Sequence, residues 1–561
     1  MTAWLTTAGR AVAYAVAGLI LLAVLTRVMV FAWAGYAIAA TLAFAYLGAT
    51  ARGRAVERRQ VTIVLEPTAN SKGEVAQGAR IALKLRVRNC GGGWLPRASV
   101  KLPACSGLQW ESEAQSLGAV APGSQTSCVV YARAVRSGRW TLHGVEIASD
   151  DWLGWMRVSS WLPQRVRVTV VPRSVASQSR VLAERVEARG ALPAGLHRAR
   201  RAGDGYDVRQ LRDYAPGDDL RRIAWNASAR RGKLLLRQNE DEVTTSHVIA
   251  IDLASSLRAG PDEAVFEATL AVAAAGIAGA ERRRDRIGVV SFADQALGAL
   301  PCRDGTVHYQ NMVEHLLVLA TATDAGVTES GDADVTERLA DHVLLHDRVQ
   351  FRITNSDTLA PIGERVRVGA LERWVQSTHA AEVDAARRRR DAAGFSADLS
   401  LVRLASQALG LELAPRTSTW TPTRLTGFRK ALEHLPELTR QRATVVLLTD
   451  LAGTTEWASL KPSVRGLQAR GHKLSLLVPD VPQFVPSTES EVSEEVHRLF
   501  SLAESTLRRD VAAQWRKMGV PVRFFGPDDA PQSLWEDACR SASAGQSRAY
   551  AAPAAGGCPV D

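Results

Sequence analysis

Two long uncharged stretches open the chain, from Ala11 to Thr26 and from Val28 to Thr50, with only Arg27 between them. An α-helix needs about 20 residues to cross the ~30 Å hydrocarbon layer of a membrane. The second stretch exceeds that length, and the first reaches it by including Trp4 and Leu5 or by outward extension of the Arg27 side chain. A signal peptide is the alternative, but a second span follows at once and no small-residue cleavage site separates the two. The pattern therefore predicts an uncleaved two-helix transmembrane hairpin over residues 1–55.

Arginine is distributed unevenly around these two stretches. Arg10 precedes the first stretch, and only Arg27 lies between the two stretches. A cluster follows the second stretch and consists of Arg52, Arg54, Arg58 and Arg59. Positively charged residues favour the cytoplasmic side of a membrane. We therefore expect a two-pass inner-membrane protein whose soluble domains are cytoplasmic. The six cysteines form no CxxC pair and no zinc-type cluster, which agrees with a reducing compartment.

Short alternating segments follow the hairpin. From Ile81 to Arg88, apolar and polar residues alternate strictly, which is typical of a strand with one buried face. Similar runs recur up to Val171 and are separated by turn sequences such as the glycines at 91–93. The pattern predicts an antiparallel β-sandwich over residues 56–175.

Further along, continuous apolar runs alternate with segments of helical period. His247–Asp252, Arg286–Phe292 and Arg442–Asp450 have the composition of buried strands. Strands separated by helices indicate a parallel sheet in a doubly wound α/β domain. We predict this domain over 244–301 and 421–530, an insertion over 302–420, and, from a composition rich in Ala, Gly, Ser and Pro, a flexible tail over 531–561.

Composition narrows the classes of function. With 46% hydrophobic and 23% charged residues, the chain buries real cores and is not disordered as a whole. The net charge of +11 suits an anionic membrane surface or an acidic partner. Because the charge is spread along the chain, binding to nucleic acid is the least favoured hypothesis.

The segment 176–243 joins the two predicted domains and is dense in arginine and aspartate. One interpretation is a network of Arg–Asp ion pairs that fixes a loop. The other is an anion site built by arginines, and this second interpretation uses Arg209, Arg212, Arg221 and Arg222.

This segment also carries a resemblance. Its aromatic, glycine and charged positions resemble the signature of the domain-of-unknown-function 58 family, and the positions concerned are Gly205, Arg209, Tyr214, Gly217, Asp218, Arg221, Trp225 and Arg230. The resemblance implies a bacterial membrane-tethered protein with a von Willebrand factor A-like domain. It also implies a partner of the MoxR-type AAA+ ATPase class.

Two predicted strands end in aspartate, at Asp252 and Asp450, and carboxyl strand ends are where doubly wound folds bind ligands. The arrangement resembles the metal-ion-dependent adhesion site of A-domains, which implies that Asp252, Ser256, Thr426 and Asp450 hold Mg²⁺. Thr423 is the rival of Thr426. Ala254 occupies the place of the first serine of the motif, so the site is degenerate. Two alternatives stay open: a water replaces the missing ligand, or the site is an empty relic.

Two histidines of the insertion, His342 and His346, have the spacing of a zinc-binding pair on a helix. No third ligand accompanies them in the sequence, so we interpret them as surface histidines.

No Walker loop, HExxH or GxSxG motif occurs, which disfavours an enzyme. The leading hypothesis is a membrane-anchored interaction protein that engages a partner through the A-like domain. The alternative is a Mg²⁺-dependent hydrolase acting on a phosphorylated or cell-envelope substrate through residues 204–222.

Overall fold

The computed structural model describes the protein over residues 2–57, 60–67, 74–174, 198–215, 223–242, 245–258, 260–321, 327–347, 349, 368–395, 399–415, 424–450, 456–485 and 491–549. The chain divides into two compact units. The first contains residues 1–171, 333–378 and 405–412, and the second contains 172–332, 379–404 and 413–561.

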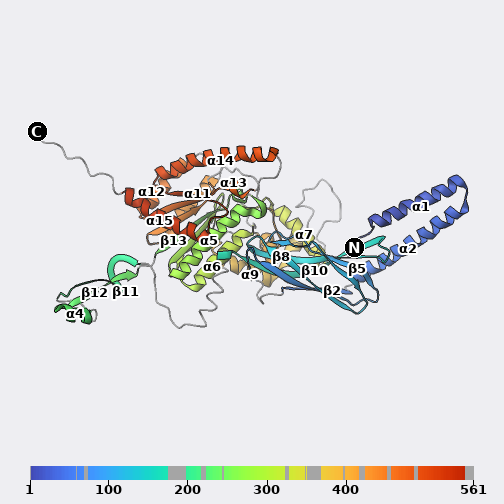
Figure 1. Cartoon of the computed structure of the whole chain (residues 1–561), viewed down its shortest axis with the longest axis horizontal. Helices are drawn as coiled ribbons and strands as arrows, with labels where there is room; N and C mark the ends of the chain where they lie inside the picture. Colours follow the sequence, from blue (N-terminus) through green and yellow to red (C-terminus); the bar gives the residue numbers. More distant parts are fainter. Residues whose placement is uncertain are drawn as a thin grey trace. The chain divides into compact units, whose positions relative to one another are not determined.

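Two apolar helices, α1 (Thr7–Thr26) and α2 (Met29–Glu57), lie side by side in the first unit (Figure 1). They have the length and hydropathy of membrane spans and bury little of their surface in the protein. This confirms the two apolar N-terminal helices. A third helix, α5 (Ala264–Arg283), lies in a segment that meets the same length and hydropathy criteria, but 83% of its most apolar window is buried. We therefore interpret α5 as a core helix.

A short strand, β1 (Thr2–Leu5), precedes α1 and pairs antiparallel with β10 (Met156–Val171), with Thr2 opposite Ser159. Thr6 then caps α1, because its hydroxyl accepts a hydrogen bond from Gly9 N at 3.0 Å. The chain on both sides of the hairpin thus contributes strands to one sheet.

The rest of the first unit is built mainly from antiparallel sheets that enclose one apolar cluster. One sheet has the order β1-β10-β9-β5-β7, with β3 (Glu74–Ala76) beside β10, and includes β9 (Gly138–Asp150), β5 (Leu95–Lys101) and β7 (Ala114–Val120). The other has the order β2-β4-β8-β6 and consists of Val61–Pro67, Arg80–Asn89, Gln125–Ala134 and Leu108–Trp110. Leu83, Leu85 and Val87 face the cluster, as the alternating pattern predicted.

The second unit contains a six-stranded sheet of order β15-β14-β13-β16-β17-β18. Its strands are Ala296–Arg303, Arg286–Phe292, Ser246–Asp252, Ala443–Leu448, Lys473–Pro479 and Val522–Phe525, in that order across the sheet. All neighbours are parallel except β14 and β15. The order reverses at β13, which is the switch point of a doubly wound sheet. The predicted α/β region is confirmed.

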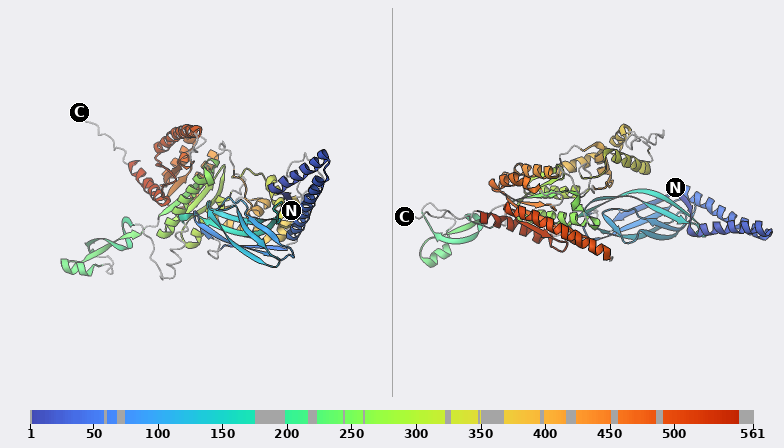
Figure 2. Two further views of the ribbon diagram at one scale, coloured as in Figure 1. Left: turned by 45° about the vertical axis from the view of Figure 1, so that its right-hand side comes forward. Right: turned by 90° about the horizontal axis from the view of Figure 1, so that it is seen from above.

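Helices cover both faces of this sheet. Ile249 and Ile251 pack with α5, α6 (Thr306–Ala320) and α15 (Pro531–Ala549), whereas Val248 and Ala250 pack with helices on the other face. Those helices are α11 (Arg424–Leu438), α12 (Lys461–Ala469) and α14 (Glu491–Lys517), and Figure 2 gives further views of them.

The prediction of a flexible tail from residue 531 is wrong for 531–549. Helix α15 buries Leu534 and Trp535 in the core, and the Trp535 ring lies against Gly276 of α5 so closely that a Cβ at Gly276 would come within 2.8 Å of it. Composition suggested a tail, but two large apolar side chains at helical spacing outweigh it.

The predicted insertion is likewise not one module. Residues 333–378, with α7 (Asp332–Asp347) and α8 (Val368–Thr378), belong almost entirely to the first unit, as do residues 405–412. Helix α9 (Ala380–Ala392) belongs to the second unit, and α10 (Leu401–Leu409) has residues in both units.

The strand β11 (Arg198–Asp213) pairs with β12 (Leu235–Glu242), and α4 (Trp225–Arg231) lies between them in sequence.

Candidate functional site

Two aspartates meet at the carboxyl edge of the six-stranded sheet. Asp252 is the last residue of β13, and Asp450 follows the end of β16 by two residues. Because β13 and β16 are parallel neighbours, both carboxylates come to the same edge. Neither side chain has any exposed surface.

The guanidinium of Arg424 lies between these carboxylates. Its Nη2 donates to Asp252 Oδ2 at 2.6 Å and to Asp450 Oδ1 at 2.5 Å, and its Nε donates to Asp252 Oδ2 at 3.2 Å. Thr449 completes the group, because its hydroxyl donates to Asp252 Oδ2 at 2.7 Å and accepts from Arg424 at 3.2 Å. We call these four residues the strand-end cluster.

Burial sets the electrostatics of this cluster. Desolvation raises the pKa of Asp252 above its usual range, and the nearby Asp450 charge acts in the same direction, although Arg424 opposes both. Desolvation disfavours the charge of Arg424, but Asp252 and Asp450 outweigh it and hold the pKa of that guanidinium above its ordinary value. The arginine is therefore a permanent cation inside the site.

The predicted ligands do not assemble around one empty position. Asp252 and Asp450 come together, whereas Thr426 is exposed on α11. Ser256 lies in a 3-10 helix, Ser255–Arg258, and its buried hydroxyl has no hydrogen-bond partner among the described residues. Asp252 Oδ1 accepts instead from the backbone N–H of Ala254 at 3.0 Å. Thr423 lies outside the described residues.

This arrangement does not fit a magnesium ion between the two carboxylates, because the guanidinium already takes that position. A cation there would have to displace Arg424 from Asp252 and Asp450. The magnesium ion expected from the sequence would therefore require an arrangement other than this one.

Sequence reasoning missed Arg424 and Thr449. Thr449 is next to Asp450, so the strand end itself pointed to it. Arg424 is the first residue of α11. The only feature of the sequence that pointed to it is its position, one turn before the buried Phe428 on an amphipathic helix.

The family-like signature positions are only partly described. Gly217, Asp218 and Arg221 lie outside the described residues, and Arg209 is placed by its backbone in β11. Tyr214 is half-buried, and Arg230 is exposed in the last turn of α4. Trp225, the first residue of α4, is 63% exposed. Neither interpretation of this segment, ion-pair network or anion site, is decided.

A second grouping lines a cavity of about 530 Å³ near the amino end of β13. Cys539 Sγ lies 3.8 Å from His247 Nδ1, and His247 Nε2 lies 3.6 Å from Asp285. The order of groups resembles a nucleophile with its base, but burial raises the pKa of the Cys539 thiol to about 12. The thiol therefore stays protonated at neutral pH and is a poor nucleophile.

Comparisons with known proteins give one family match. Residues 210–373 match the family model described as "Protein of unknown function DUF58". No curated protein matches the chain. Among solved structures, a CARDB domain from Pyrococcus furiosus is 10% identical, with 20% of this chain and 94% of that chain covered and a TM-score of 0.13. A FixG-related protein from Vibrio parahaemolyticus is 13% identical, with coverage of 20% and 96% and a TM-score of 0.14. Scores this low carry no argument about fold or function.

Proposed function

The chain is a member of the DUF58 family of proteins of unknown function, and from this premise we propose that it is a membrane-anchored interaction protein. In this proposal, the α/β unit docks a partner protein at the carboxyl edge of its sheet. The two apolar helices supply the anchor. The arginines that flank them support a cytoplasmic location for the docking unit.

The strand order supports an A-like assignment of this unit. A parallel sheet with one antiparallel edge strand and a switch point at β13 resembles the von Willebrand factor A-like fold. Doubly wound folds bind their ligands at the switch point, outside the carboxyl ends of the strands. Asp252 and Asp450 flank that point.

The observation that carries the proposal is the hydrogen bonding of Arg424 to both aspartates. In this account the guanidinium takes the role that a divalent cation has in the adhesion site of A-domains. It neutralises charge between two strand ends and fixes the start of α11 against them. Docking is then independent of metal, because the cation is part of the chain.

The surface beside the cluster suits an acidic partner. Helix α11 begins with the buried Arg424 and exposes Thr426, Arg429 and Lys430 in its next turns. Two adjacent cations at the rim of an interface attract an anionic surface and accelerate association. The family resemblance suggests a MoxR-type AAA+ ATPase as that partner.

The test uses full-length protein in detergent and a purified, nucleotide-free MoxR-type ATPase. We expect saturable binding that a chelator leaves unchanged and that Arg424→Ala weakens at least tenfold. Arg440→Ala is the matched control, because Arg440 is exposed and lies between the end of α11 and the amino end of β16. Equal binding by wild type and Arg424→Ala would reject the docking site, and loss of binding with chelator would favour a metal-gated site instead.

The hydrolase alternative depends on Asp218 and Arg221, which lie outside the described residues. No contact among the described residues favours it.

A further inference from the structure

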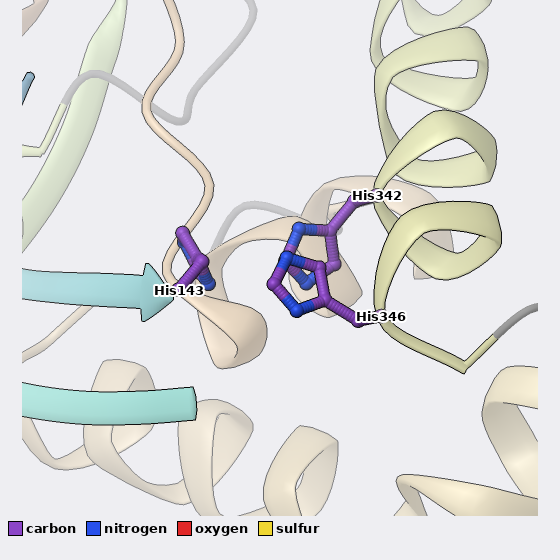
Figure 3. A group of neighbouring side chains, drawn as sticks. All are labelled: His143, His342 and His346. Carbon is purple, nitrogen blue, oxygen red and sulfur yellow. The ribbon is translucent and has the colours of Figure 1, made fainter. Parts of the chain in front are cut away.

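Three histidines converge inside the first unit: His143, His342 and His346. Each ring contributes one nitrogen, and these three nitrogens lie within 4.8 Å of one another. Figure 3 shows the rings grouped together, with His342 and His346 on successive turns of α7. His143 is thus the third candidate ligand, and it lies almost 200 residues before His342 in the sequence.

The expectation that His342 and His346 lie on the surface is wrong. Each is only 8% exposed. The reason is the buried stripe of α7, in which Val335, Leu339 and Val343 recur at helical spacing beside the two histidines. An i, i+4 pair on the buried side of a helix presents both imidazoles to the same point.

A bulge between strands positions His143. Leu142 pairs with Val166 and Gly144 pairs with Pro163, so a single residue of β9 lies opposite two residues of β10. Gly144 permits the close approach, because a Cβ there would lie 2.4 Å from the carbonyl oxygen of Leu162. Bulges that redirect one side chain are common beside functional sites.

The hydrogen bond of His143 determines which nitrogen is available. Its Nε2 lies 3.0 Å from the carbonyl oxygen of Gly410, and a carbonyl only accepts, so Nε2 carries the proton. Nδ1 therefore has a lone pair, and it is buried without a hydrogen-bond partner among the described residues. Metal-binding histidines are oriented in this way, with one nitrogen on the metal and the other donating to a carbonyl.

Charged side chains near the histidines act on a bound cation in opposite directions. The positive charge of Arg165 opposes it, whereas the carboxylate of Glu412 near His143 offsets that effect.

We propose that His143, His342 and His346 form a binding site for a single zinc ion. Imidazole suits zinc, and three protein ligands leave a fourth position for water or another ligand. Nitrogens bound to tetrahedral zinc at about 2.0–2.1 Å lie roughly 3.4 Å apart, so the three nitrogens, which lie within 4.8 Å of one another, need only small movements to bind one ion. The site would join α7 to β9, and it is independent of the strand-end cluster.

The rival explanation is packing alone. His143 meets His342 edge to face at 4.5 Å between ring centroids, and His342 lies 4.1 Å from His346. Such pairs contribute to stability, but packing alone leaves the buried Nδ1 of His143 without a hydrogen bond, which carries an energetic penalty. A bound metal removes that penalty.

The experiment uses full-length protein in detergent, without a histidine tag, stripped of metal and then loaded with zinc. We expect one zinc per chain by mass spectrometry, and affinity at least tenfold lower in His143→Ala and His346→Ala. His434→Ala is the matched control, because His434 lies partly exposed on α11. X-ray absorption on wild-type protein should show three imidazole nitrogens on the zinc, which needs no variant to fold.

Two outcomes overturn the zinc proposal. One is wild-type protein that retains no stoichiometric zinc. The other is zinc binding that Asp252→Asn abolishes and His143→Ala leaves intact, which would place the ion at the strand-end cluster. Failure of the zinc site leaves the docking proposal untouched, because the two sites share no residue.

Discussion

Arg424 Nη2 lies 2.6 Å from Asp252 Oδ2, across 172 positions of sequence, in the interior of the α/β unit. The same nitrogen also bonds Asp450, so one guanidinium joins the ends of two strands to the start of α11. Removing one partner of a buried ion pair destabilises a protein by about 3–5 kcal/mol, because the remaining charge stays buried without its partner. The geometry of the strand-end cluster therefore depends on where α11 packs against the sheet.

The close contact of α11 with the sheet leads to a prediction at Gly427. A Cβ at this residue would lie 2.0 Å from the carbonyl oxygen of Ala293, so Gly427→Ala must push α11 away from the end of β14. We expect the free energy of unfolding of the α/β unit to fall by roughly 2–4 kcal/mol, a large value for a single substitution with a backbone clash.

Gly466→Ala in α12 is the matched control. No atom lies within 4 Å of a Cβ added there, and alanine in a helix interior is favoured over glycine by about 1 kcal/mol. Calorimetry of both variants in detergent measures the difference. Equal unfolding temperatures in the two variants would show that α11 does not pack closely against the sheet.

His315 gives a prediction about pH. Burial is the main cause that lowers the pKa of His315 to about 4, with the charge of Arg390 acting in the same direction, while its Nδ1–H donates to the carbonyl of Ala393 at 2.6 Å. Because the folded-state pKa lies below the unfolded value of about 6.5, the unfolded chain takes up the proton first. The contribution of His315 to stability is therefore complete above pH 6.5 and is lost as pH falls toward 4.

The loss amounts to roughly 3 kcal/mol over that interval. His315→Asn keeps an N–H donor at the same position but does not titrate. We expect its unfolding temperature to depend less on pH between 6.5 and 4 than that of wild type. Parallel curves for the two proteins would show that folding does not lower the pKa of His315.

The pairing of β1 with β10 predicts the topology of the hairpin. Because Thr2 lies opposite Ser159 in one sheet, we expect the amino terminus and the chain that follows the hairpin to occupy the same compartment. Reporter fusions measure this directly: a fluorescent protein at either terminus should be active in the cytoplasm, and alkaline phosphatase placed between α1 and α2 should be active outside it. Opposite locations of the two termini would contradict the pairing, and phosphatase activity at both termini would reverse the orientation.

The sequence anticipated elements whose signal is local. Alternation from Ile81 to Arg88 predicted β4, and apolar runs ending in Asp252 and Asp450 predicted two parallel strands with their carboxylates at one edge. It did not anticipate contacts that depend on where distant segments pack. Arg424 enters the site because α11 lies on one face of the sheet, and no spacing rule relates it to Asp252.

His143 illustrates the same limit from the other side. Its place in the strand pattern gave no sign that a bulge would turn it toward α7, so the spacing of His342 and His346 had no visible third partner. The prediction for residues 531–549 failed for a different reason. Small residues dominate the composition of α15, and Leu534 and Trp535 are its only large apolar side chains that indicate burial.

The central claim is that Arg424 takes the place of a divalent cation at the strand ends. Calorimetric titration of full-length protein in detergent with millimolar magnesium tests this most directly, with Arg424→Ala and Asp252→Asn as companions. We expect no binding by wild type or Asp252→Asn, and one magnesium per chain in Arg424→Ala, where two carboxylates and the hydroxyls of Thr449 and Ser256 become available. Stoichiometric magnesium binding by wild type that is lost in Asp252→Asn would contradict the claim.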